Sequence, residues 1–111
     1  YIELWATWCQ PCIEYIPDFE KLKEKFKNNK EIVFLSISID DDFKRWNRFN
    51  TSINNSGIQW IINRSKLSEY RVVEIPRTII IDKKFKIADM YGPSPSDKEV
   101  EKVLNQLLSN E

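Results

Sequence analysis

The chain has 111 residues, of which 41% are hydrophobic, and its 17 Lys and Arg residues balance its 17 Asp and Glu residues. This length and apolar fraction fit a single domain with one hydrophobic core. The zero net charge gives no electrostatic footprint for nucleic acid or an anionic membrane, and no apolar run is long enough to span a membrane. There is no histidine, which removes the usual general base and the commonest metal ligand.

The chain opens on a short apolar run, residues 1–5, which predicts a buried strand. No initiator Met precedes this run, and no signal peptide is present. We therefore expect the sequence to be a fragment of a longer protein, with any targeting segment or membrane tether upstream of Tyr1.

The only two cysteines, Cys9 and Cys12, follow this strand and are separated by two residues. A helix is predicted after them, from about Pro11 to about Asn28, with Pro17 bending it. The cysteines therefore lie where a strand ends and a helix begins. Because the N-terminus of a helix favours an anion, a thiolate forms there at lower pH than a free thiol would. The predicted apolar face of this helix consists of Ile16, Phe19, Leu22 and Phe26.

The next segment, residues 31–39, is β-branched and nearly all apolar, which is typical of a central parallel strand. Asp40, Asp41 and Asp42 offer an N-cap and first-turn acids for a second helix, residues 42–53. A metal site at these aspartates is the weaker interpretation, since no further ligands follow at the spacing of an EF-hand loop. The apolar stripe of this helix, which we expect to be core, is Phe43, Trp46, Phe49 and Ile53.

The second half of the chain predicts shorter elements. Residues 58–62 suggest a short extended piece, and residues 65–71 suggest a short helix. Residues 78–82 form an apolar strand after Pro76, and a hairpin turn at Asp82 leads into a further strand, residues 85–91.

The last helix is predicted to begin with a capping box formed by Ser96 and Glu99. A parallel strand pair joined by a helix, then an antiparallel hairpin and this last helix, gives an α/β fold: a small mixed sheet with helices on both faces. The apolar face of the last helix consists of Val100, Val103, Leu104, Leu107 and Leu108.

The residues around the cysteines, Trp-Ala-Thr-Trp-Cys-Gln-Pro-Cys at positions 5–12, resemble the active site of thioredoxin-fold oxidoreductases. The best match is the membrane-tethered or secreted TlpA/ResA-like thiol–disulfide oxidoreductases of bacteria, since Trp8, Pro11 and Pro17 stand where that family has them. The resemblance covers nearly the whole chain. It implies one thioredoxin-like domain over residues 1–111, a three-layer α/β/α sandwich with a mixed central sheet. It also implies a TlpA-type insertion between Asp40 and Val73.

We expect Cys9 to be the exposed nucleophile, bordered by Trp8 and Pro11, and Cys12 to lie deeper in the first helical turn. Cys9 would attack a substrate disulfide to form a mixed disulfide, and Cys12 would then attack Cys9 and release the reduced substrate. Gln10, where thioredoxins usually have Gly, and Pro11 should tune the reduction potential of the pair.

Glu3 is the candidate proton acceptor for Cys12, because it lies six residues before Cys9 in an otherwise apolar strand. Thioredoxins carry a buried Asp at this position, and a carboxyl group in apolar surroundings has a raised pKa. The alternative is that Glu3 points to solvent or pairs with a lysine. ResA-like proteins often carry a second Glu where this chain has Tyr15, and Glu14 leaves the helix in another direction.

The resemblance also implies that Pro76 has a cis peptide bond, faces the cysteine pair and keeps metal ions away from the thiols. It would leave Ile75 free to pair its backbone with an extended substrate. The alternative is an ordinary edge-strand proline. Trp5, Trp8 and Ile75 could form an apolar rim for protein substrates, although Trp5 fits plain core equally well.

Competing functions are less well supported. A structural zinc ion usually needs four Cys or His ligands, and one Cys pair supplies two, so we expect no metal and no other cofactor. A purely structural disulfide would close too short a ring to constrain much chain entropy. The main alternative is a redox-inactive thioredoxin-like module that binds proteins.

The sequence therefore predicts a thiol–disulfide oxidoreductase that reduces protein disulfides outside the cytoplasm, in the periplasm or cell envelope. The resemblance supplies both the direction and the location. The expected partners are protein dithiol or disulfide substrates, with apocytochrome c as one candidate, and an upstream redox partner.

Overall fold

The structure is a computed structural model of the chain, and it describes residues 1–53, 55, 57–66 and 74–110. Within these residues, five strands form one sheet in the order β3-β2-β1-β4-β5. The elements in chain order are β1 (Ile2–Trp5), α1 (Gln10–Glu14), α2 (Ile16–Lys25), β2 (Leu35–Ser38), α3 (Phe43–Ser52), β3 (Ile58–Ile61), β4 (Arg77–Ile81), β5 (Ile87–Asp89) and α4 (Val100–Ser109).

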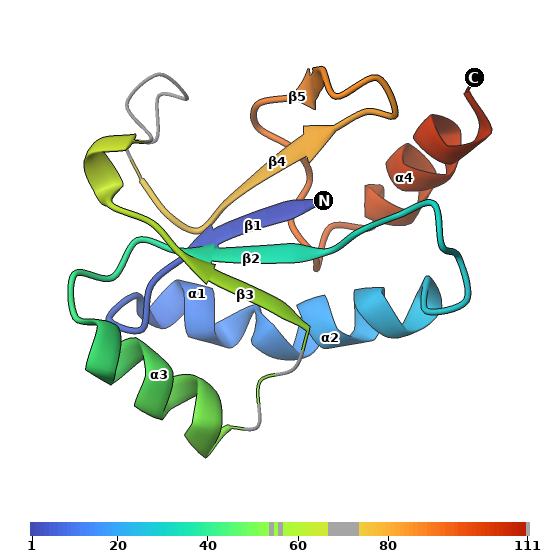
Figure 1. Cartoon of the computed structure of the whole chain (residues 1–111). Coiled ribbons are helices and arrows are strands. Elements are labelled where there is room, and N and C mark those ends of the chain that lie inside the picture. Colours follow the sequence, from blue (N-terminus) through green and yellow to red (C-terminus); the bar gives the residue numbers. More distant parts are fainter. Residues whose placement is uncertain (54, 56, 67–73, 111) are drawn as a thin grey trace.

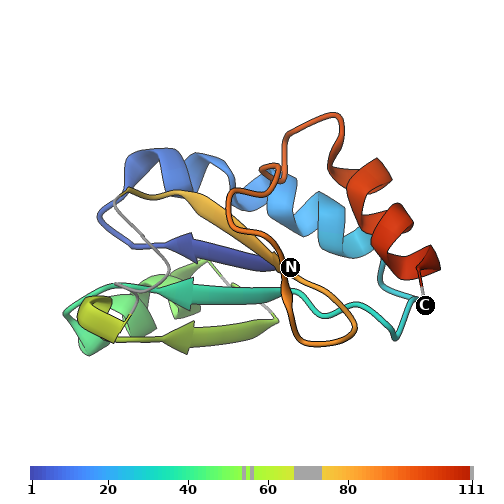
Figure 2. The ribbon, with the colours of Figure 1, turned by 90° about the horizontal axis from the view of Figure 1, so that it is seen from above.

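The sheet is mixed, as the sequence predicts. β1, β2 and β3 run parallel, whereas β4 runs antiparallel to both β1 and β5. Helices α1 and α2 cross one face of the sheet, and α3 packs beside them (Figures 1 and 2). The short helix predicted at residues 65–71 falls mostly outside the described residues. Only a single 3₁₀ turn at residues 64–66 is described there.

Two clusters of buried side chains hold the helices to the sheet. The first surrounds the cysteine pair and includes Leu4 and Trp5 from β1, Trp46 from α3 and Ile79 from β4. The second ties α2 and α4 to the other end of the sheet through Tyr1, Phe19, Leu22, Phe26, Ile80, Val100 and Leu104. The predicted apolar faces of α2 and α4 are therefore confirmed as core.

The helix after the cysteines is bent, as predicted, and the break lies at Tyr15, between α1 and α2. Pro17 is the cause, because it has no N–H to donate and its ring clashes with the carbonyl four residues earlier. The Tyr15 N–H instead bonds to the Cys12 carbonyl at 3.1 Å, which closes α1 with a tight turn. The second part of the helix ends at Lys25, earlier than the predicted Asn28.

The start of α3 follows the sequence prediction, but its apolar stripe does so only in part. Asp42 is the N-cap, and its carboxylate accepts the Arg45 N–H at 3.0 Å. Trp46 is buried and Phe49 packs on the first cluster. Phe43 and Ile53 are 58% and 42% exposed, so the expectation that they are core is wrong: they lie at the two ends of a short helix that has its contacts at the centre.

Two other boundaries differ from the prediction. β2 covers only residues 35–38 of the predicted 31–39, because its partners β1 and β3 each offer four residues for pairing. The capping box of Ser96 and Glu99 is wrong: α4 begins after Glu99, which makes no side-chain cap. The Glu99 N–H is instead taken by the Asp97 carboxylate at 2.8 Å, in a run of turns before the helix.

Candidate active site

The cysteine pair lies where β1 ends and α1 begins, as predicted. Cys9 and Cys12 form a disulfide, with their Cα atoms 5.3 Å apart. Cys9 is the N-cap of α1, and its Sγ atom accepts the backbone N–H of Cys12 at 3.3 Å. A backbone N–H at the start of α1 is therefore directed at the Cys9 sulfur.

The expectation that Cys9 is exposed is wrong for the disulfide form. Cys9 is 6% exposed and Cys12 is 4% exposed, because both sulfur atoms pack in the first core cluster. The neighbouring side chains of Trp8, which is 49% exposed, Gln10 and Pro11 reach solvent. Trp5 is 4% exposed, so it is core and not part of a rim.

A buried carboxylate anchors the loop that leads to the cysteines. Asp40 is 5% exposed and lies just after β2. Its carboxylate accepts the Thr7 N–H at 3.0 Å, the Thr7 hydroxyl at 2.7 Å and the Ser38 hydroxyl. The sequence analysis assigned Asp40 to a helix cap and missed this role. The sequence did contain a signal for this contact, because a polar residue follows each of two neighbouring parallel strands. The ends of such strands meet at one edge of a sheet.

Glu3 is buried in the centre of the sheet, with 5% of its surface exposed. Its carboxylate accepts the Thr78 hydroxyl at 2.8 Å, so the alternative of a solvent-facing or lysine-paired Glu3 is wrong. Burial raises the pKa of Glu3 to about 8, and the Thr78 hydrogen bond opposes that rise. A carboxyl group with such a pKa can both accept and release a proton near neutrality.

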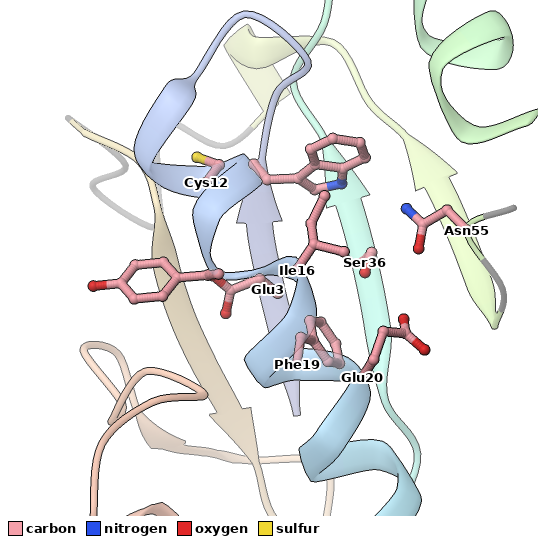
Figure 3. Close-up of a pocket in the computed structure, with 9 residues that line it drawn as sticks. Glu3, Cys12, Ile16, Phe19, Glu20, Ser36 and Asn55 are labelled. Carbon is pink, nitrogen blue, oxygen red and sulfur yellow. The ribbon is translucent and has the colours of Figure 1, made fainter. Parts of the chain in front are cut away.

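A cavity of about 20 Å³ separates Glu3 from α1 and α2, and both Glu3 and Cys12 line it. This volume suffices for one water molecule. Figure 3 shows Glu3 rising from β1 and Cys12 from α1, with Ile16, Phe19 and Glu20 of α2 along the wall. The cavity lined by these residues therefore has room for one water molecule.

Pro76 lies directly before β4, and the Ile75–Pro76 peptide bond is cis. Because β4 pairs with β1 on one side and β5 on the other, Pro76 opens an internal strand and is not an edge-strand proline. Ile75 packs against the cluster that contains both cysteines. Pro76 also lines a groove of about 170 Å³ together with Glu3, Tyr15 and Tyr91.

Arg77, which the sequence analysis did not single out, closes the same groove. It is 6% exposed, and its Nε and Nη2 atoms donate to the Met90 carbonyl at 2.8 and 2.6 Å. Its guanidinium group lies 4.0 Å from the centre of the Tyr91 ring. These contacts tie the residue after Pro76 to the segment that follows β5.

In the part of the chain that the structure describes, no three His, Cys, Asp or Glu side chains gather in a way that could hold a metal ion. Within the same residues, none of the helices combines the length and the apolar character needed to cross a membrane.

A mixed sheet with a Cys-x-x-Cys disulfide at a helix start and a cis-proline before the internal antiparallel strand defines a thioredoxin-type dithiol site. A family model described as "Thioredoxin-like" matches residues 2–87. The chain belongs to this thioredoxin-like family.

Several of its relatives are named thiol–disulfide oxidoreductases. A crystal structure of a candidate thiol–disulfide oxidoreductase from Bacteroides vulgatus is 40% identical, with a TM-score of 0.89 over 96% of this chain and 75% of that chain. The thioredoxin-like protein YneN of Bacillus subtilis is 26% identical over 94% of this chain. Thiol-disulfide oxidoreductase ResA of Bacillus thuringiensis is 22% identical over 96% of it. The chain spans 62% of the length of each of these two curated relatives.

The buried anchor at Asp40 leads to a stability prediction. Asp40→Asn keeps the size of the side chain but sets an NH₂ group against one of three donors that now point at the carboxylate. We expect the free energy of unfolding to fall by about 2–4 kcal/mol. Urea unfolding followed by tryptophan fluorescence measures this, with the exposed Asp41→Asn as the matched control. Equal stability of the two variants would contradict the anchoring role.

Proposed function

We propose that this chain is the catalytic domain of a thiol–disulfide oxidoreductase that reduces protein disulfides outside the cytoplasm. The observation that supports this best is the Cys9–Cys12 disulfide at the start of α1, with the Cys12 N–H directed at the Cys9 sulfur. The names of its relatives support the reaction class, and the resemblance to TlpA/ResA-like proteins supports the direction and the location.

The proposed reaction has two exchange steps. The Cys9 thiolate attacks one sulfur of a substrate disulfide, so that a Cys9–substrate disulfide forms and one substrate thiolate leaves. Cys12 then loses its proton and attacks the Cys9 sulfur, which expels the second substrate thiolate. The products are the reduced substrate and the Cys9–Cys12 disulfide, and two electrons have passed from the protein to the substrate. An upstream dithiol partner must reduce the pair again.

Glu3 is the proposed proton acceptor for Cys12. The two groups line one cavity with room for a single water molecule, so a proton can pass between them through one bridging water. The pKa of Glu3, about 8, lies close to that of an ordinary thiol, about 8.5. Proton transfer between groups of similar pKa is nearly balanced in free energy, and the proton can move both ways during a cycle.

The proposed substrate surface consists of Trp8, Pro11, Ile75 and Pro76. Trp8 and Pro11 are exposed beside Cys9, as is Gln10. Ile75 packs against the cysteine cluster and is half-buried, so its backbone can pair with an extended substrate segment. Apocytochrome c is one substrate that the family resemblance suggests, and general reduction of protein disulfides is another.

The direction of the reaction can be tested by the reduction potential of the Cys9–Cys12 pair. We expect a value near that of thioredoxin, about −270 mV, since a reductant must hold a stable disulfide once oxidised. Equilibration in thiol–disulfide buffers with counting of free thiols measures it. A value near −120 mV, that of DsbA, would make the protein an oxidant. A pair that never closed would leave the redox-inactive binding module as the better function.

The order of attack can be tested by trapping. With Cys12→Ser, the second step cannot occur, so we expect a stable mixed disulfide between Cys9 and a disulfide-containing test protein such as insulin. Non-reducing gel electrophoresis and mass spectrometry detect it. The matched variant Cys9→Ser should trap nothing, because it is the Cys9 sulfur, at the start of α1, that accepts a backbone N–H. Equal trapping by the two variants would contradict the assignment of Cys9 as nucleophile.

The proposed state of Glu3 predicts a pH dependence of stability. Its pKa is about 8 when folded and near the ordinary value of 4.5 when unfolded, so the folded state binds more protons between these two pH values. The contribution of the protonated carboxyl group to the free energy of unfolding is therefore complete below about pH 4.5 and is lost as pH rises through about 8. Glu3→Gln should remove this loss. The free energy of unfolding of the variant, relative to that of the unmodified protein, should therefore rise between pH 5 and 8. Chemical denaturation at several pH values measures the difference, and parallel pH profiles would contradict a raised pKa.

A further inference from the structure

The register of the sheet places Thr78 directly opposite Glu3. Both residues are cross-strand partners in the antiparallel β1–β4 pair, and their side chains lie on the same face. Thr78 is 3% exposed, and its hydroxyl donates to Glu3 Oε2 at 2.8 Å. Among the described residues, this is the one hydrogen bond recorded at the Glu3 carboxyl group. The ionised form of Glu3 therefore depends on a single neutral hydroxyl.

The Tyr1 hydroxyl extends this contact into a row of three hydrogen-bonding groups. The Tyr1 hydroxyl lies 3.4 Å from Thr78 Oγ1 and donates to the Pro93 carbonyl at 2.7 Å. Burial raises the pKa of the Tyr1 phenol, so this hydroxyl keeps its proton at neutral pH. Its own proton is committed to Pro93, which leaves its oxygen free to accept a proton from Thr78.

We propose that Thr78 is a positioning residue for the thiol–disulfide reaction, because its hydroxyl can serve both protonation states of Glu3 by turning between Glu3 and Tyr1. This rests on the proposed role of Glu3 as proton acceptor for Cys12. When Glu3 is ionised, the Thr78 hydroxyl donates to its carboxylate. When Glu3 is protonated, its O–H donates to Thr78 Oγ1, and the Thr78 proton turns toward the Tyr1 oxygen.

No proton leaves Thr78 or Tyr1 in this rearrangement. The proton taken from Cys12 stays on Glu3, and one hydroxyl rotates by a single torsion. A threonine hydroxyl has one proton and two lone pairs, so it can donate and accept at once. Each state of the buried carboxyl group thus keeps one hydrogen bond, which avoids the cost of an unpaired polar group.

Other titratable and charged groups surround Glu3 from every element packed on it. Cys12 and Glu20 line the cavity on the helix side, and Tyr15, Glu74, Arg77 and Tyr91 line the groove on the Pro76 side. These residues contribute a background that the variants below leave unchanged. Tyr1, which directly precedes the strand of Glu3, is the one member of the set that a variant below replaces.

The experiment measures the pKa of Glu3 and the rate of substrate reduction in the whole chain. Thr78→Val keeps the shape but removes the hydroxyl, so the ionised carboxylate loses its donor and the pKa of Glu3 should rise by about one unit. Below that pKa the ionised fraction, and with it the single-turnover rate, should fall about tenfold. Thr78→Ser keeps the hydroxyl and should remain close to the unmodified protein.

Tyr1→Phe gives a second, opposite test that leaves Thr78 in place. When Glu3 is protonated, the Thr78 hydroxyl then loses the Tyr1 oxygen as its acceptor. This loss destabilises the protonated form, so the pKa of Glu3 should fall. A role for Thr78 in packing alone would not move the pKa in opposite directions in these two variants. Titration of the Glu3 carboxyl carbon by NMR measures both shifts directly, and far-UV circular dichroism verifies that each variant is folded.

The two proposals fail in different ways. If Glu3→Gln leaves the pH profile of the rate unchanged, the role of Glu3 is overturned and the role of Thr78 with it. If Glu3→Gln removes the titration but the pKa of Glu3 in Thr78→Val matches that of the unmodified protein, only the Thr78 proposal is overturned. If Thr78→Val does not fold, the direction of the Tyr1→Phe shift decides: a fall in the pKa supports the proposal, and no change or a rise refutes it.

Discussion

A carboxyl group buried in the central strand is the constraint on which the rest of this site depends. Leaving Glu3 ionised in the core would be costly, since a buried charge is stable only when it is hydrogen-bonded or paired. The antiparallel pairing of β1 with β4 supplies one hydroxyl at the right position. The result is a weak acid in a site whose chemistry needs a proton acceptor near neutral pH.

The cysteine pair is held from two sides by buried polar contacts. On one side, Asp40 binds the backbone and side chain of Thr7, two residues before Cys9. On the other, Arg77 fixes the residue after Pro76 to the Met90 carbonyl. Both contacts are shielded from solvent, where a hydrogen bond to a charged group is strongest. They hold in place the two loops that border the disulfide.

Glu3 lines both the small cavity and the larger groove of the site. The small cavity connects it to Cys12, and the larger groove connects it to Pro76 and the surface that we assign to substrate. One group therefore contacts the space next to the resolving cysteine and the space next to the substrate surface. This placement explains how a residue with 5% exposure could exchange protons in each cycle without unfolding of the sheet.

The sequence by itself determined what depends on neighbours in the chain. The Cys9–Cys12 spacing, the break caused by Pro17 and the cap at Asp42 each follow from contacts within a few residues. The tertiary structure decided what depends on pairing between distant segments. The donor at Glu3 requires the β1–β4 register, and a shift of one residue would turn Thr78 to the other face of the sheet. The burial of Cys9 and the anchor at Asp40 require the ends of β1 and β2 to meet at one edge of the sheet. The capping box at Ser96 was wrong for a different reason, because Asp97 competes for the same N–H over a shorter distance in the chain.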